Sequence, residues 1–133
     1  DTIIGEFKLL SRKQNKEFCC LEEEIDSVRV IENGDVRTVV EAVFGYKNSY
    51  AVVNYIMSQT GKFSIKIHLV WNQKQEMLKF NIPVDFKIEK YIGEQPYGQE
   101  EMKFNMENVS QKYVIVSSLN KAMAICNNGV YKN

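Results

Sequence analysis

Two runs of alternating side chains constrain the fold of this chain more than any other feature. Apolar residues alternate with mostly polar ones from Phe63 to Trp71, and the same period returns from Leu78 to Ile88. A period of two is typical of a β-strand with one buried face. The short polar segment between the runs predicts a loop that joins them in an antiparallel hairpin. Burial of the apolar side chains of two strands stabilises them by less than the conformational entropy lost when they are ordered. The rest of the chain must therefore cover their apolar face.

The same pattern predicts the core. We expect six side chains of the hairpin to be buried there: Ile65, Ile67, Leu69, Phe80, Ile82 and Val84. Trp71 shares their face, so we interpret it as part of the core or its edge. A sugar-stacking platform is the alternative for this side chain.

Other segments predict further strands. The strongest turn signal is Asn33-Gly34-Asp35, because glycine can adopt the positive φ that primed hairpin turns require. Residues 21–28 fit either a helix or a strand, and we expect Glu89–Gly98 to be a structured loop. The remaining expected strands are Ile3–Leu10 at a sheet edge, Phe18–Leu21, Val28–Glu32, Val36–Tyr46, Tyr50–Met57, a brief strand through Met102, Phe104 and Met106, Tyr113–Ser118 and Ala122–Cys126. The sequence therefore predicts an all-β chain, folded as an antiparallel β-sandwich over residues 1–133, as one domain or a fragment of one.

Charge and length exclude several classes of partner. The 133 residues carry 17 basic and 17 acidic side chains, a formal net charge of zero. Nucleic acids and anionic membranes both select clustered positive charge, so we expect neither as a partner. No run of apolar residues is long enough to span a bilayer. The chain begins Asp1-Thr2-Ile3 without an initiator Met or a signal-peptide pattern, and we expect an excised segment of a longer protein.

The cysteines and the histidine predict no metal site in this segment. Cys19 and Cys20 are adjacent, the third cysteine is Cys126, and no C-x-x-C spacing occurs. We interpret all three as small buried or half-buried hydrophobes in a reducing compartment, which favours a cytoplasmic protein. The only histidine, His68, falls on the polar side of its strand, where a surface role is the default.

Acidic residues offer the one hint of catalysis. Glu94, Glu100 and Glu101 lie near one another in the sequence, and a pair of carboxylates can cleave a glycosidic bond. Sequence spacing does not fix their separation in space, and the Glu22-Glu23-Glu24 run is typical of a solvated face. No phosphate-binding loop or H-E-x-x-H motif is present. The residues alone therefore indicate a β-sandwich without catalytic residues.

Four short motifs occur in an order that is similar to one known family. They are Asp35-Val36-Arg37-Thr38-Val39-Val40-Glu41, Trp71-Asn72 with Met77-Leu78-Lys79-Phe80, Glu94-Gln95-Pro96-Tyr97-Gly98, and Ala124-Ile125-Cys126-Asn127-Asn128-Gly129-Val130-Tyr131. Over about Val28 to Tyr131 the chain resembles the C-terminal β-sandwich region of the α-mannosidases of glycoside hydrolase family 38. The family patterns read roughly G-P-V-R, W-x-E-x-x-x-x-L-K, E-I-P-Y-G and L-N-D-G-x-Y. Asp35 replaces the usual proline, and Gln95 replaces an apolar residue.

The resemblance implies a detached piece of an enzyme. Family members hydrolyse α-mannosides with an aspartate nucleophile, an acid carboxylate and a zinc ion, all held in an N-terminal barrel that this segment lacks. It implies that the partner is that catalytic domain, with mannose-containing carbohydrate as the parent's substrate and zinc as the parent's cofactor. Glu94, Pro96, Tyr97 and Gly98 are the candidates for a surface that faces the substrate pocket or the catalytic domain.

Two further expectations remain open. A free-standing carbohydrate-binding or protein-interaction sandwich is the alternative function. The turn at Asn127-Asn128-Gly129 predicts a last hairpin whose returning strand, Val130–Asn133, is very short. An unpaired sheet edge there predicts self-association.

Overall fold

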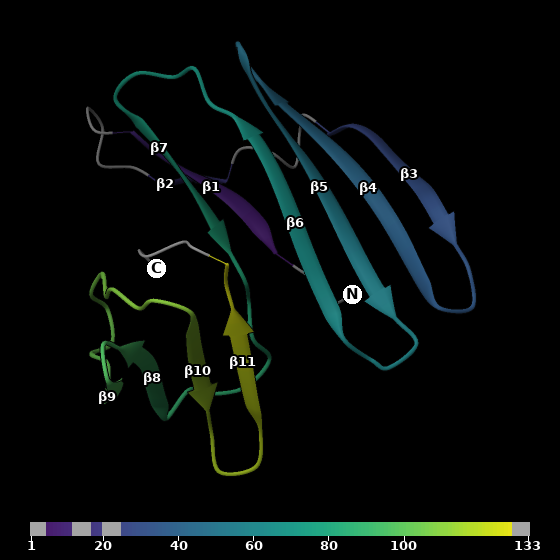
Figure 1. Cartoon of the computed structure of the whole chain (residues 1–133). Helices are drawn as coiled ribbons and strands as arrows, with labels where there is room; N and C mark the ends of the chain where they lie inside the picture. The colour runs from purple at the N-terminus through teal and green to yellow at the C-terminus, as the bar shows by residue number, and fades with distance from the viewer. Residues whose placement is uncertain (1–4, 12–16, 20–24, 129–133) are drawn as a thin grey trace. The chain divides into compact units, whose positions relative to one another are not determined.

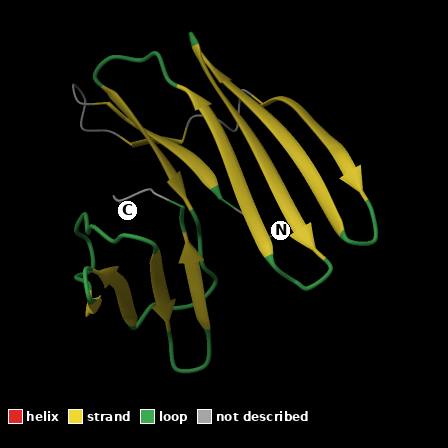
Figure 2. Ribbon diagram, viewed as in Figure 1, coloured by secondary structure: helices red, strands yellow, loops and turns green. Residues whose placement is uncertain are grey.

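The computed structural model describes residues 5–11, 17–19 and 25–128, which contain eleven strands and no helix (Figures 1 and 2). All strand pairs are antiparallel, so the prediction of an all-β antiparallel fold is confirmed. The chain divides into two compact units, residues 1–83 and residues 84–133. The assignment of residues 1–133 to a single domain stays a prediction.

Unit 1 contains two sheets. One is a meander of β3 (Ile25–Asn33), β4 (Arg37–Tyr46), β5 (Ser49–Ser58) and β6 (Phe63–Val70), in that order. The other has the order β2-β1-β7, with β1 at Glu6–Ser11, β2 at Glu17–Cys19 and β7 at Glu76–Asn81. We expected the first strand to lie at an edge, but β7 pairs with it and places it in the middle.

The predicted hairpin of Phe63–Trp71 with Leu78–Ile88 is wrong. β6 pairs with β5, β7 pairs with β1, and the segment between β6 and β7 carries the chain from one sheet to the other. A two-residue period fixes which face of a strand is buried, but it does not identify the neighbouring strand. The two apolar faces therefore belong to separate sheets instead of lying side by side in one.

The second run also stops being a strand earlier than expected. β7 ends at Asn81, and residues 82–89 belong to no strand. Pro83 lacks an N–H group and disfavours a continued ladder. Side chains from Ile82 to Ile88 still alternate between half-buried and exposed. The alternation of apolar residues here therefore indicates which side chains are partly buried, although the segment is not a strand.

The two sheets of unit 1 pack through one apolar cluster, which confirms the sandwich for this unit. Its buried members are Phe7 of β1 with Ala51 and Val53 of β5, and six half-buried side chains pack against them: Phe44, Tyr46, Tyr55, Ile65, Leu78 and Phe80. The predicted core is partly wrong. Ile67 and Leu69 are 40% and 43% exposed, because β6 is an edge strand of its sheet, and Ile82 and Val84 are only half-buried.

The β3–β4 turn forms where the sequence predicts it, but by different means. Gly34 does not adopt a positive φ, and its N–H donates to the Arg37 carbonyl at 3.0 Å. A left-handed backbone conformation is found in the next hairpin, where Lys47 has a φ of 51° in the short turn between β4 and β5.

Unit 2 is a four-stranded sheet with the order β11-β10-β8-β9. Its strands are β8 (Lys90–Gln95), β9 (Gly98–Glu101), β10 (Tyr113–Ser117) and β11 (Ala122–Cys126). The last two match their predictions. β8 lies within the segment Glu89–Gly98 that was expected as a loop, and β9 was not predicted as a strand. The strand expected through Met102, Phe104 and Met106 is a loop instead.

Gly93 explains why the sequence pattern did not predict strand β8. It interrupts the apolar alternation of the strand, and the side chain of Met102 occupies the space beside it, so that a Cβ on Gly93 would overlap the Met102 terminal methyl. Met102 and Ser110 are both buried, and Val114 of β10 is buried as well. The loop after β9 thus folds back to supply the core of unit 2.

Candidate functional site: the turn between β8 and β9

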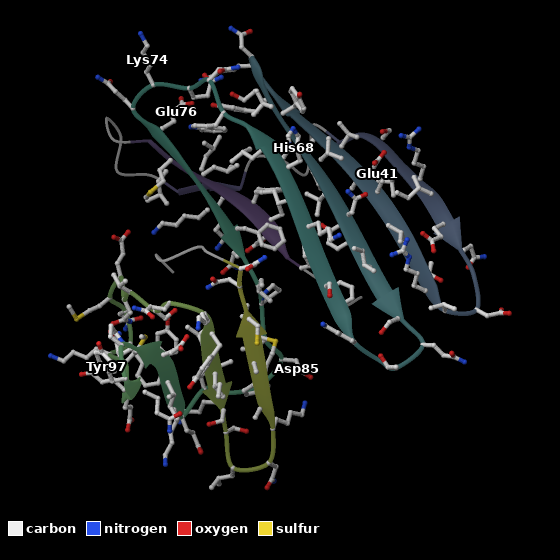
Figure 3. All side chains as sticks on the ribbon, viewed as in Figure 1. Glu41, His68, Lys74, Glu76, Asp85 and Tyr97 are labelled. Carbon is white, nitrogen blue, oxygen red and sulfur yellow. The ribbon has the colours of Figure 1, made fainter. Side chains whose placement is uncertain are left out.

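The four predicted interface residues lie together at one hairpin turn, at which Tyr97 is labelled in Figure 3. Glu94 is in the last part of β8, Gly98 begins β9, and Gln95 pairs with Gly98 across the turn. Pro96 and Tyr97 form its tip, and Tyr97 has a left-handed φ of 69°. Proline presets the φ that the second turn position needs.

Side-chain hydrogen bonds hold the base of this turn against the following loop. The Glu94 carboxylate accepts from the backbone N–H of Lys112 at 2.9 Å, and the Gln95 side-chain amide donates to the Val109 carbonyl at 2.6 Å. The Gln111 N–H also donates to the Glu94 carbonyl at 3.3 Å. The turn is therefore fixed relative to residues 109–112, and no sequence signal indicated these contacts.

The tip itself projects into solvent. Tyr97 is fully exposed, at 109% of its reference area, and a Cβ placed on Gly98 would meet nothing within 4 Å. Large apolar side chains in the adjoining loop are exposed too, with Phe104 at 48%, Met106 at 63% and Val109 at 57%. An exposed apolar surface of this kind is suited to contact with another protein surface.

The three candidate carboxylates do not converge in an enclosed pocket, although the hairpin register puts Glu94 and Glu101 on the same face. Glu94 uses an oxygen to bind the Lys112 amide, while Glu100 and Glu101 are exposed consecutive residues of β9 and so point to opposite faces of the sheet. Glycosidic cleavage needs two carboxylates facing each other across the bond. The arrangement offers no such pocket.

Trp71 and His68 take the positions that the sequence favours. Trp71 is half-buried, its ring stacks on Tyr46 with 6.1 Å between centroids, and its Nε1–H donates to the Glu76 carbonyl. These contacts fit the edge of the core better than a sugar platform. His68 is exposed on β6 (Figure 3). Its ring centroid lies 6.5 Å from that of Tyr50.

A polar cluster that the sequence did not reveal joins the β4–β5 turn to the start of β7. Lys47 Nζ lies 2.8 Å from Glu76 Oε1 and 4.7 Å from the centre of the Tyr46 ring. The hydrogen bond to Glu76, with a smaller contribution from Tyr46, raises the pKa of Lys47 to about 12. Beside it, the buried Ser49 hydroxyl accepts from Asn72 N at 2.9 Å and from Gln73 Nε2 at 3.0 Å. The partners are more than twenty residues apart in sequence, so no local motif could predict them.

Neither a binding cavity nor a metal centre stands out within the described ranges. A hollow of about 10 Å³ near Ala51, Leu69 and Trp71 has room for about one water molecule. Residues 5–11, 17–19 and 25–128 contain no group of three or more His, Cys, Asp or Glu side chains suited to hold a metal ion. The same residues include no helix that could cross a membrane.

One cysteine departs from expectation. Cys126 is a free, exposed thiol at the end of β11, where it lies on the outward-facing side of an edge strand. Cys20 and the side chain of Cys19 lie outside the described part of the chain.

Comparison with known families agrees with the motifs. The profile of the glycosyl hydrolases family 38 C-terminal domain matches residues 5–132. No curated protein and no solved structure matches the chain. Because the profile covers nearly all of the sequence, the chain belongs to the glycosyl hydrolase family 38 C-terminal domain family.

Proposed function

We propose that this domain is the non-catalytic C-terminal portion of an α-mannosidase-like glycoside hydrolase, packing on a separate catalytic barrel and completing its pocket. The family match over residues 5–132 carries the proposal. The exposure of the Glu100 and Glu101 carboxylates and of the lone His68 supports it, because a hydrolytic site encloses its carboxylates around the substrate. The barrel would supply the zinc and act on mannose-containing carbohydrate.

The turn at Glu94–Gly98 is the proposed contact surface with that barrel. It is the place in unit 2 where a fixed backbone presents a fully exposed aromatic ring. The free thiol of Cys126 fits a reducing compartment, so we propose a cytoplasmic enzyme.

Self-association is a further proposal about partners. In the described residues β11 pairs only with β10, which leaves its other edge without a strand. An open edge can recruit a strand from a second copy. The predicted edge at Val130–Asn133 lies outside the described residues.

Activity measurements test the main proposal. The chain alone should not hydrolyse an activated aryl α-mannoside, with or without added zinc, whereas the enzyme that contains both this domain and the barrel should. Turnover by the chain alone that disappears in Glu94→Gln or Glu100→Gln would place catalysis in this domain and contradict the proposal.

A further inference from the structure

The turn between β8 and β9 holds a tyrosine where such a turn normally holds a smaller residue. Gln95 and Gly98 are paired across it, Pro96 is the second residue, and Tyr97 is the third, with a φ of 69°. A proline followed by a residue with positive φ is the pattern of a type II turn, which favours glycine or asparagine at the third position. Other residues meet steric resistance in this left-handed region. The conformation of Tyr97 therefore costs stability.

No contact among the described residues offsets this cost. Tyr97 is fully exposed and takes part in none of the ring contacts of the structure. Lys47 also has a positive φ, but its side chain binds Glu76 and lies over Tyr46. The remaining described residues of this kind other than glycine are polar, Gln75 and Asn105, and exposure of a polar side chain carries no hydrophobic penalty. Within the described ranges, only Tyr97 combines a strained backbone with an exposed aromatic ring, which points to a role outside this fold.

The surroundings of Tyr97 suit a protein partner better than a sugar. Sugar sites combine a ring with polar groups aimed at hydroxyls, but here the side chains of Glu94 and Gln95 are already bonded to the backbone of Lys112 and Val109. The loop that Gln95 holds exposes apolar side chains, and charged residues with exposed side chains flank it at Lys103 and Lys112. An apolar centre with a polar rim is the usual composition of a protein interface.

We propose that Tyr97 is the anchor by which this domain binds the catalytic domain of its own enzyme, its ring filling an apolar socket there. The inference rests on the proposed function, which supplies the partner. Tyrosine is enriched among residues that dominate binding energy, and a braced turn lowers the entropy lost when the ring is immobilised. Phe104, Met106 and Val109 extend the contact around it.

Hydroxyl-radical footprinting of the complete enzyme, read by mass spectrometry, tests the assignment. Leu119 is the internal control, because it is 88% exposed and lies in the β10–β11 turn of the same unit. After correction for intrinsic reactivity, Tyr97 should be labelled at least about tenfold less than Leu119. Equal labelling would mean that Tyr97 is free in the enzyme and would overturn the inference.

Three variants separate an anchor from a structural residue. Tyr97→Gly suits the turn, so it should leave the melting temperature of the isolated chain unchanged or higher. In the complete enzyme the same variant should raise labelling of Phe104 and Met106 severalfold. Tyr97→Phe should keep them protected, and Leu119→Ser should have no effect.

Two outcomes distinguish this inference from the proposed function. If Tyr97→Gly raises only the KM for an aryl α-mannoside while Phe104 and Met106 stay protected, the ring contacts substrate and the anchor role is wrong. If the complete enzyme does not hydrolyse α-mannosides at all, the proposed function fails, whatever the footprint of Tyr97.

Discussion

The ring of Phe80 lies against the ring of Phe7, with 5.0 Å between their centroids and 62° between their planes. The two residues are directly paired across β7 and β1, and Phe7 also contacts Phe44 of the facing sheet at 5.4 Å. This edge-on group of rings connects the two sheets of unit 1, because aromatic pairs in this geometry add to the energy of burial.

Removing the Phe80 ring should therefore destabilise unit 1. We expect Phe80→Ala to lower the free energy of unfolding by about 3 kcal/mol, at the low end for a phenylalanine because the ring is half-buried. Urea denaturation measures this directly. Phe63→Ala is the matched control, since Phe63 is 39% exposed on an edge strand and should cost about 1 kcal/mol. Equal costs would mean that Phe80 does not belong to the core.

Two glycines of the β8–β9 hairpin should respond differently to alanine. Gly93→Ala must displace Met102 from its buried position and should cost about 1–3 kcal/mol. Gly98→Ala meets open space at a φ that is not positive, so its effect should stay within about 0.5 kcal/mol. Thermal unfolding of both variants tests the difference, and a severe loss in Gly98→Ala would show that the tip is packed.

The Lys47–Glu76 pair predicts a dependence of stability on alkaline pH. The folded protein raises the pKa of Lys47 from 10.5 to about 12, so the pair contributes fully below about pH 10.5. Its contribution is lost as the pH rises from about 10.5 to 12. The melting temperatures of the protein and Lys47→Met should differ at neutral pH and converge across this window.

A matched variant assigns the cause of the shift. In Glu76→Gln, the pKa of Lys47, followed by NMR at its Cε, should fall toward 10.5, because the charged acceptor has gone. Added salt should reduce the effect, since both side chains are partly exposed. A Lys47 pKa that stays near 12 in this variant would assign the shift to another group.

The free edge of β11 predicts association that a charge should suppress. Ala124 is an exposed residue of this strand, and lysine on an edge strand opposes pairing with a second sheet. Sedimentation velocity should show concentration-dependent association of the unaltered chain and a monomer for Ala124→Lys. Monomers of both at high concentration would mean that this edge is already protected.

The sequence predicted the positions of most strands, but it did not predict most of the pairs that they form. The β3–β4 hairpin was predicted because its turn is short and its two strands are adjacent in the sequence. The pairing of β1 with β7 was missed, since no local pattern links Phe7 to Phe80. β8 was missed because Gly93 interrupts its period, and the packing of Met102 against it is a tertiary contact.

In the candidate site, too, the residues could be predicted from the sequence, whereas their conformation and contacts could not. Glu94, Pro96, Tyr97 and Gly98 were selected because they belong to one short sequence motif, and the structure places them at one turn. The left-handed conformation of Tyr97 and the contacts of Gln95 with Val109 depend on backbone geometry and on a distant segment. Neither is encoded in local periodicity.

The pairing of β1 with β7 has a consequence for synthesis on the ribosome. The Glu6 carboxylate accepts a hydrogen bond from the Asn81 side chain, so partners 75 positions apart must meet. Strands β3 to β6 emerge and pair in succession, while β1, translated before them, has no strand on its β7 side until β7 leaves the exit tunnel. The nascent chain is thus most prone to aggregation before β7 emerges, and slowing translation upstream of Glu76 would prolong that exposure.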